Sequence, residues 1–175
     1  MTHDEMVALI RGGVMQTGGT WADFGAGSGN FTRALRELTG ESAVIYAVDK
    51  NRGALSRQNA DVHTISADFA RPIPELPPLD GLLVANALHF VRRQRDVIEQ
   101  LAGYLRPGGS FLVVEYEVNM PRSFIPNPLP YSKFVQVAAE TGLDNIRQVG
   151  SRTSPRNGMT MYAAHANKPE TRNNL

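Results

Sequence analysis

The chain has 175 residues, an apolar fraction of 42%, no cysteine and a formal net charge of +1 at neutral pH. Such a chain can form one domain with a complete core, and the missing cysteines exclude disulfides, zinc–thiolate sites and cysteine nucleophiles, which is compatible with a cytoplasmic location. The near-neutral charge argues against a nucleic-acid partner, and no apolar run approaches the ~20 residues of a membrane-spanning helix, so no membrane partner is expected.

Helical and extended patterns alternate along the chain. In chain order they predict a helix over 4–15, a strand over 20–24, a helix through Phe31, Leu35 and Leu38 that ends at Gly40, a strand over 43–48, a short helix over 52–59, strands over 62–67 and 81–87, a helix through Val97, Leu101 and Leu105 that ends at 106–109, a strand over 110–116, a helix that closes at Gly142, and strands near 146–149 and 159–164. The run 43–48 is nearly unbroken in apolar residues, as in strands buried on both faces of a parallel sheet. The alternation predicts an α/β fold with a doubly wound, mostly parallel Rossmann-like sheet, helices on both faces and an antiparallel C-terminal hairpin.

Two segments contain four prolines each, and neither can form a regular helix. They are residues 71–78 and residues 119–130. Residues 1–166 are predicted to form a single domain, and the polar residues 167–175 are predicted to be a disordered tail.

Polar residues follow several of the predicted strands. Ligands of doubly wound sheets bind beyond the carboxyl ends of the strands. The residues at or near those ends are Asp23, Asp49, Asp68, Asn86, Glu115 and Tyr116. We therefore expect them on one edge of the sheet, which we call the site edge.

The segment Asp23–Asn30 joins a predicted strand to a predicted helix. Its three alternating glycines permit a sharp turn and leave no side chain between the backbone and a ligand, and the helix presents free N–H groups at its start. Asp49 ends the next strand, where an acid can accept hydrogen bonds from ribose hydroxyls. These features suit NAD and S-adenosylmethionine alike. Asn30 replaces the third glycine of the dinucleotide fingerprint, and Asp23 suits a cationic ligand, so S-adenosylmethionine is favoured.

The segments WADFGAGSG, IYAVDKN, SADFA, DGLLVANALHF, and LRPGG followed by SFLVVEY occur in this order along the chain. Together they resemble the motifs of class I S-adenosylmethionine-dependent methyltransferases of the small-molecule type. They cover residues 21–116, and the family's antiparallel last strand accounts for the terminal hairpin. The resemblance implies S-adenosylmethionine as the cofactor, S-adenosylhomocysteine as its product, and a small-molecule methyl acceptor as the partner.

The resemblance also implies roles for individual residues. The cofactor-binding residues that it implies are Asp23, Gly25, Ala26, Gly27, Asp49, Lys50, Asp68, Phe69, Asn86 and Ala87. The turn glycines would face the methionine part, with Asp23 near its ammonium group, and the residues after the fourth strand would line the sulfonium side. Asp49 would bind the ribose hydroxyls, Asp68 the adenine amino group, and Lys50 or Asn51 would border the adenine.

His89 is predicted as a general base. It lies just past the fourth strand, where the family often places groups that face the substrate, and a histidine can accept a proton at neutral pH. The alternative is a histidine that only packs or forms hydrogen bonds there. Tyr116 or Glu115 is the second choice, and alternation along the strand sends only one of them toward a given face. The other histidines lack metal-ligand spacing with His89, so no metal site is expected.

The segment before the last predicted helix bears on the acceptor. The letters NPLPY over 127–131 resemble the N-P-P-Y motif of amino-group methyltransferases, but they are interrupted and follow the fifth strand, so we regard the match as coincidental. Family members often carry N-terminal helices over the substrate, and little precedes the first strand here. Residues 119–130 are therefore the expected lid or substrate wall, and a pocket completed by a second subunit of a homo-oligomer is the alternative.

Two other functions stay open at this point. One is an NAD(P)-dependent oxidoreductase, which Asn30 disfavours. The other is a cofactor-binding protein of the same fold without turnover.

Overall fold

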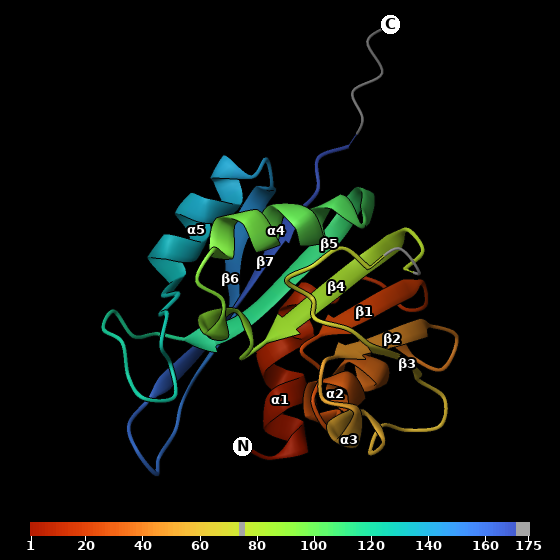
Figure 1. Cartoon of the computed structure of the whole chain (residues 1–175), viewed down its shortest axis with the longest axis horizontal. Coiled ribbons are helices and arrows are strands. Elements are labelled where there is room, and N and C mark those ends of the chain that lie inside the picture. Colours follow the sequence, from red (N-terminus) through yellow and green to blue (C-terminus); the bar gives the residue numbers. More distant parts are fainter. Residues whose placement is uncertain (74–75, 171–175) are drawn as a thin grey trace, which may run out of the picture.

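The computed structural model describes residues 1–73 and 76–170, and within them one twisted sheet of seven strands forms the centre of the molecule (Figure 1). The strands are β1 (Thr20–Phe24), β2 (Val44–Asp49), β3 (His63–Ser66), β4 (Leu79–Ala85), β5 (Leu105–Tyr116), β6 (Asp144–Thr153) and β7 (Thr160–Asn167). Their order is β3-β2-β1-β4-β5-β7-β6, and only the pairs that involve β7 are antiparallel. This arrangement confirms the predicted fold class.

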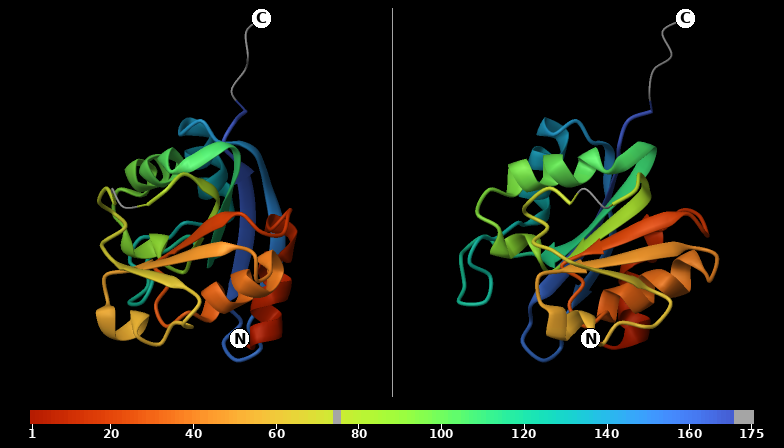
Figure 2. Two further views of the ribbon diagram at one scale, coloured as in Figure 1. Left: turned by 90° about the vertical axis from the view of Figure 1, so that its right-hand side faces the viewer. Right: turned by 45° about the vertical axis from the view of Figure 1, so that its right-hand side comes forward.

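Helices cover both faces of the sheet (Figure 2). They are α1 (His3–Ile10), α2 (Asn30–Thr39), α3 (Arg52–Leu55), α4 (Gln94–Gly103) and α5 (Tyr131–Glu140), with short 3-10 helices η1 (Arg11–Gly13) and η2 (Leu88–Phe90). Helices α1 and α2 pack on one face, and α4 and α5 pack on the other. No helix within the described ranges has the length and apolar character that crossing a membrane requires.

Strand parity decides which layer each side chain meets, because successive side chains point to opposite faces. Trp21 of β1 packs in the core beneath α1 and α2, whereas Phe24 packs in the core beneath α4 and α5. On β5, Val114 belongs to the first core and Val113 to the second. The same alternation separates Glu115 from Tyr116 at the end of β5.

The start of β5 differs most from the prediction. The predicted helix end at residues 106–109 is wrong, because the helix ends at Gly103 and Leu105 already pairs with Leu79 of β4. The register then shifts before Ser110, as expected for a bulge, and Gly108 adopts a φ of 77° there. Proline is tolerated at a bulge, so the proline and glycines lie inside an irregular strand instead of ending a helix.

Other boundaries shift by a few residues. The helix predicted over 4–15 stops at Ile10 and continues only as η1, where the missing Cβ of Gly13 lets the backbone pack closely against the side chain of Leu112. The helix predicted over 52–59 ends at Leu55, and β4 begins and ends earlier than the strand predicted over 81–87. Both strands of the terminal hairpin are longer than predicted.

The tail predicted from residue 167 begins too early. Asn167 is the last residue of β7, and the backbone N–H of Lys168 donates to the carbonyl of Gly109 at 2.9 Å. Residues 171–175 of that predicted tail lie outside the described residues, as do residues 74–75 of the first proline-rich segment.

A buried polar group on β7 makes the stability depend on pH. His165 is 1% exposed, and its Nδ1 accepts from Nη1 of Arg147 at 2.8 Å while its Nε2 contacts Oγ of Ser110 at 3.2 Å. Burial, together with the Arg147 charge, lowers the pKa of His165 from 6.5 to about 4. Between these values the unfolded chain binds a proton that the folded chain does not, so stability falls as the pH falls through this window.

We predict that His165→Gln removes this dependence, since glutamine can accept from Arg147 and donate to Ser110 without titrating. Relative to the variant, the wild type should lose about 2 kcal/mol of unfolding free energy between about pH 7 and about pH 4.5. Urea unfolding of both proteins at the two pH values measures the difference, and the comparison cancels contributions from other groups. Parallel pH curves would contradict the role assigned to His165.

Candidate functional site

The parallel strands bring the predicted polar residues to one edge. Asp23 is near the end of β1, Asp49 and Tyr116 are the last residues of β2 and β5, and Asn86 and Asp68 lie just past β4 and β3. The predicted site edge is therefore present, and two cavities open along it.

The glycine-rich turn over residues 25–29 separates β1 from α2 and borders both cavities. Gly25 has a φ of 76°, and a Cβ there would lie 2.5 Å from the Cβ of Ala87, so no larger residue fits. Gly27 has a φ of 52°, and a Cβ on it would meet nothing within 4 Å. The backbone of the turn is therefore exposed to open space, and a ligand can approach it closely because no side chain stands between them.

Asp49 ties this turn to the end of β2. Its Oδ2 accepts from the backbone N–H of Gly27 and its Oδ1 from that of Asn51, each at 2.8 Å. A carboxylate has about four lone-pair sites, so both oxygens can accept further hydrogen bonds from a ligand. Lys50 is exposed and borders the same cavity as Asp49.

The first cavity, of about 520 Å³, lies on the face of α1 and α2. Its walls come from the glycine turn, Asp23, Tyr116 and the hairpin between β6 and β7, including Arg152. The hairpin contribution was not expected from the sequence, because no local motif marks Arg152 and it comes from the far end of the chain.

The second cavity, of about 960 Å³, lies between the ends of β2 and β3 and the start of α4. Asp49, Asp68, Phe69, Ala87 and Phe90 are among the residues that line it. Oδ1 of the exposed Asp68 carboxylate accepts from the backbone N–H of Ala70 at 3.0 Å, which leaves its other oxygen without a partner among the described residues.

Asn86 borders both cavities, as Gly25 does. It has a φ of 51°, which is uncommon for a residue other than glycine. Its backbone N–H donates to Val114 at 2.8 Å, but its buried Oδ1 has no hydrogen-bond partner within the described residues. Strained backbone and buried polar atoms without a partner are common at functional sites, and among the described residues Asn86 combines both at the junction of the two cavities.

Asp23 is a buried acid on the wall of the first cavity. It is 1% exposed, and its Oδ2 accepts from Oγ1 of Thr32 at 2.7 Å. Burial raises the pKa of Asp23 to about 7; the Thr32 hydrogen bond opposes this rise and the charge of Asp49 adds to it. A cation bound beside Asp23 would favour the ionised carboxylate.

His89 and Glu115 form a buried pair on the opposite face. The side chains approach at 2.7 Å between Nδ1 and Oε2, and the His89 backbone N–H donates to Oε1 at 3.1 Å. The residues are 2% and 1% exposed, respectively. An ionised carboxylate only accepts, so beside ionised Glu115 the imidazole carries its proton on Nδ1.

The two residues that end β5 face different surroundings, as alternation requires. Tyr116 borders the first cavity, whereas Glu115 meets His89 in the other layer. His89 itself borders neither cavity. Its ring packs between Phe90, at a centroid distance of 4.2 Å, and Tyr116, at 5.9 Å, each of which lines one cavity.

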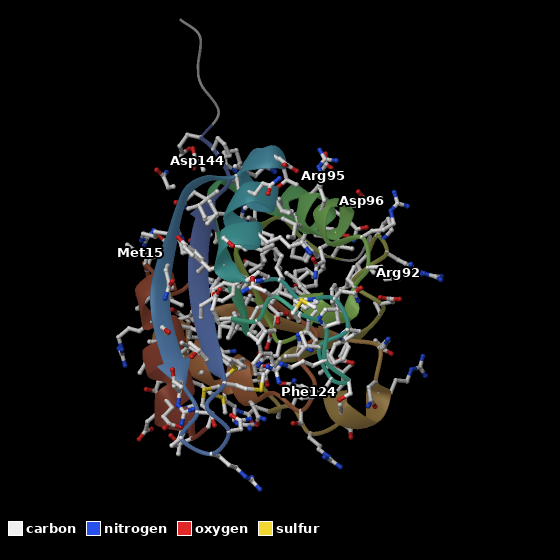
Figure 3. All side chains as sticks on the ribbon, turned by 90° about the vertical axis from the view of Figure 1, so that its left-hand side faces the viewer. Met15, Arg92, Arg95, Asp96, Phe124 and Asp144 are labelled. Carbon is white, nitrogen blue, oxygen red and sulfur yellow. The ribbon has the colours of Figure 1, made fainter. Side chains whose placement is uncertain are left out.

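The segment over residues 119–130 holds the turn that carries His89. The backbone N–H and Nδ2 of Asn127 donate to the His89 carbonyl at 3.0 and 3.2 Å, and Nε2 of buried Gln94 donates to the carbonyls of Leu88 and Asn127. Phe124 of this segment, labelled in Figure 3, packs edge-on against Tyr116 at a centroid distance of 6.2 Å. No local pattern in the sequence indicates this contact network, because Asn127 and His89 are 38 residues apart in the chain.

Comparisons with known proteins agree with this arrangement. The family model described as a methyltransferase domain matches residues 22–111. The methyltransferase gedG from Aspergillus terreus is 30% identical over 92 residues, which are 51% of this chain and 29% of that protein. The ubiquinone/menaquinone biosynthesis C-methyltransferase UbiE from Pseudomonas syringae pv. syringae is 26% identical over 112 residues, 58% of this chain and 43% of that protein. The chain thus spans less than half the length of these two relatives.

One solved structure illustrates the likeness in fold. Phosphoethanolamine N-methyltransferase 2 from Haemonchus contortus, in complex with S-adenosyl-L-methionine, has a TM-score of 0.75 and 16% identity. The match covers 95% of this chain and 52% of that chain. At this identity the likeness shows the fold alone.

We predict that Asp23→Asn stabilises the ligand-free protein at alkaline pH. The folded-state pKa of Asp23 lies above its ordinary value of 3.8, so stability falls as the pH rises from that value through about 7. The variant should therefore be more stable than the wild type by about 2 kcal/mol or more at about pH 8, and equally stable near pH 4. Urea unfolding at both pH values tests this, and a difference that does not change with pH would refute the buried charge as its cause.

Proposed function

Because this chain belongs to the methyltransferase-domain family, whose model covers just over half of it, we propose that it transfers the methyl group of S-adenosylmethionine to a nucleophilic atom of a small molecule. The observation that carries the proposal is the pair of cavities that meet at Gly25 and Asn86. One holds a buried acid suited to an ammonium group, and the other holds acids at strand ends suited to a nucleoside. An elongated ligand with those two ends fits this layout.

In this proposal the first cavity takes the methionine end of the cofactor. The bare backbone of Gly25, Ala26 and Gly27 allows close approach, and Asp23 attracts the ammonium group. Asn86 and Ala87 border the junction, where the sulfonium would lie. The buried Oδ1 of Asn86, which has no hydrogen-bond partner among the described residues, supports a polar ligand nearby.

The second cavity takes the nucleoside end. Asp49 accepts from the ribose hydroxyls, and Oδ2 of Asp68, which has no partner among the described residues, accepts from the adenine amino group. The half-buried ring of Phe69 packs against the base, and Lys50 borders it. Each assignment uses a side chain that lines this cavity.

The chain's own groups then align the acceptor and manage its proton. When bound, the cofactor supplies a methyl group that its sulfonium has already activated, so alignment and exclusion of water are the main tasks of the protein. His89 accepts the proton that the methyl acceptor loses, and its Nδ1 forms a hydrogen bond with Glu115. His89 borders neither cavity, and the rings of Phe90 and Tyr116 pack against its imidazole, so in this proposal one of these rings moves when the acceptor reaches His89.

Tyr116 serves as a hydrogen-bond donor in this scheme. Burial, followed by the charge of Glu115, raises the pKa of Tyr116 above its usual range. Its hydroxyl therefore stays protonated at neutral pH and can donate a hydrogen bond to an acceptor in the first cavity.

A small-molecule acceptor is supported by the names of the relatives, which include an enzyme of quinone biosynthesis and a phosphoethanolamine methyltransferase. Residues 119–130 form the substrate wall in this proposal, since they pack on the turn that carries His89. The homo-oligomer and the cytoplasmic location stay predictions.

We predict that Asp49→Ala weakens S-adenosylhomocysteine binding about tenfold or more, because a charge-assisted hydrogen bond to the ribose is lost. Isothermal calorimetry with S-adenosylhomocysteine and, in parallel, NAD measures this. The exposed Glu41→Ala variant has the same change in charge and should bind like the wild type. Binding of NAD but not of S-adenosylhomocysteine would refute the proposed function, and unchanged affinity in Asp49→Ala would refute the role of Asp49.

We predict that His89→Gln lowers turnover about 100-fold and leaves S-adenosylhomocysteine affinity unchanged, since glutamine can donate to Glu115 but cannot act as a base. A screen of small-molecule acceptors with S-adenosylmethionine as donor supplies the assay. Full activity in the variant would exclude His89 as the base. A wild type that binds the cofactor but methylates none of the acceptors would favour the non-catalytic alternative.

A further inference from the structure

Four ring side chains pack in a row at the site edge. The imidazole of His89 lies between the rings of Phe90 and Tyr116, at centroid distances of 4.2 and 5.9 Å. Tyr116 in turn packs edge-on against Phe124, at 6.2 Å. We call Phe90, His89, Tyr116 and Phe124 the aromatic row. Its members come from η2, from the end of β5 and from the segment over residues 119–130, so three separate parts of the chain form it.

The two ends of the aromatic row are exposed. Phe90 is 63% exposed and Phe124 is 49% exposed. Every other phenylalanine, tyrosine and tryptophan within residues 1–73 and 76–170 is buried or half-buried. Exposed apolar side chains that gather in one place indicate a contact surface, whereas scattered ones need no explanation. The exposed aromatic side chains of the described chain are therefore concentrated at this row.

The aromatic row lies beside the place proposed for the methyl group. Phe90 lines the second cavity and Tyr116 lines the first, and Asn86 borders both. The helix η2 begins two residues after Asn86, and the backbone N–H of Asn86 donates to the carbonyl of Val114, two residues before Tyr116. An acceptor that packs on the row therefore lies next to the junction of the two cavities.

Exposed rings of this kind favour an aromatic acceptor over an aliphatic one. Aromatic rings attract one another because the positive edge of one ring meets the negative face of the next. Contacts within the row already have this geometry, since the rings of Tyr116 and Phe124 meet at an interplanar angle of 80°. A flat aromatic acceptor can form the same edge-to-face contacts with the exposed rings, and an aliphatic acceptor of equal size cannot.

His89 narrows the choice of reacting group. Its Nδ1 contacts Glu115, and its Nε2 has no hydrogen-bond partner in the described part of the chain. An imidazole is a weak base, so it most readily takes a proton from a group that is itself weakly acidic. A phenolic hydroxyl has a pKa of about 10, whereas an aliphatic hydroxyl is close to water, at about 15.7. Of the two, the phenolic hydroxyl suits a histidine base.

We propose that the methyl acceptor is a hydroxylated aromatic molecule, which packs on the aromatic row and reacts through a phenolic hydroxyl. The phenolic oxygen bonds to the methyl carbon while the bond from that carbon to the sulfonium sulfur breaks. The electron pair of the broken bond stays on sulfur, and the hydroxyl proton passes to Nε2 of His89. This inference rests on the proposed function, because it uses the junction as the place of the methyl group and His89 as the base.

A matched pair of probes isolates the aromatic contribution. The probes are 2-naphthol and decahydro-2-naphthol, which share a carbon skeleton and one hydroxyl and differ in the saturation of the rings. Calorimetric dissociation constants are measured on protein saturated with S-adenosylhomocysteine, for the wild type, Phe90→Leu, Phe124→Leu and Tyr46→Leu. Tyr46 packs against the imidazole of His63 at 5.2 Å and lines neither cavity, so its variant loses a ring beside a histidine without touching the site.

The wild type should bind 2-naphthol about tenfold more tightly than the saturated probe, because two exposed rings each add an aromatic contact. Burial of apolar area alone would not produce this preference, since the saturated probe is at least as apolar. Each leucine variant of the row keeps an apolar side chain but loses one ring, so the preference should fall to about threefold. Tyr46→Leu should keep the full preference. With S-adenosylmethionine as donor, the wild type should convert 2-naphthol to its methyl ether and leave the saturated alcohol unchanged.

Equal binding of the two probes by the wild type, or binding of neither, would overturn the proposal, as would a preference that both row variants keep. Failure to methylate 2-naphthol, or equal methylation of the saturated alcohol, would overturn the phenolic step. A wild type that does not bind S-adenosylhomocysteine would instead refute the proposed function, so the two failures are distinguishable. Because the preference is a ratio within each protein, the wild-type ratio remains a test even if a variant does not fold.

Discussion

The hydrogen bond from the backbone N–H of Gly27 to Asp49 joins the turn after β1 to the end of β2, and the layout of the site follows from it. The backbone N–H of Gly25 is held in the same way by the carbonyl of Val48, at 2.8 Å. The turn, fixed at both points, borders both cavities, and α2 begins at the wall of the first cavity, which Asn30 lines. A close approach of Gly25 to Ala87 lies where the two cavities meet.

Because successive side chains of β5 point to opposite faces of the sheet, Tyr116 and Glu115 lie in different layers. Tyr116 points with the α1 and α2 layer into the first cavity, and Glu115 points with the α4 and α5 layer toward His89. A shift of one residue in the register of β5 would exchange them and separate the buried pair. The bulge that follows Leu105 therefore matters to the site, because it sets the register of the strand that follows.

Several groups at the site edge lower the stability of the ligand-free fold. Asp23 is a buried carboxylate whose one side-chain partner is the hydroxyl of Thr32 among the described residues, and Asn86 combines a positive φ with an unpaired oxygen. Unpaired buried polar groups and strained backbone each cost on the order of 1–3 kcal/mol. A ligand that supplies a cation and a donor would recover part of this energy, so the arrangement favours binding over stability in the free protein.

Local patterns in the sequence determined the order of helices and strands, the glycine turn and the acids at the strand ends, because each depends on neighbouring residues and on where a strand stops. The start of β5 was not determined in this way, since Leu105 follows a helical spacing but pairs with Leu79. Only the tertiary structure decided that His89 meets Glu115 and that Arg152 reaches the first cavity. Such contacts depend on strand register, on side-chain parity and on how the terminal hairpin folds back beside β5, and residues far apart in the chain set these together.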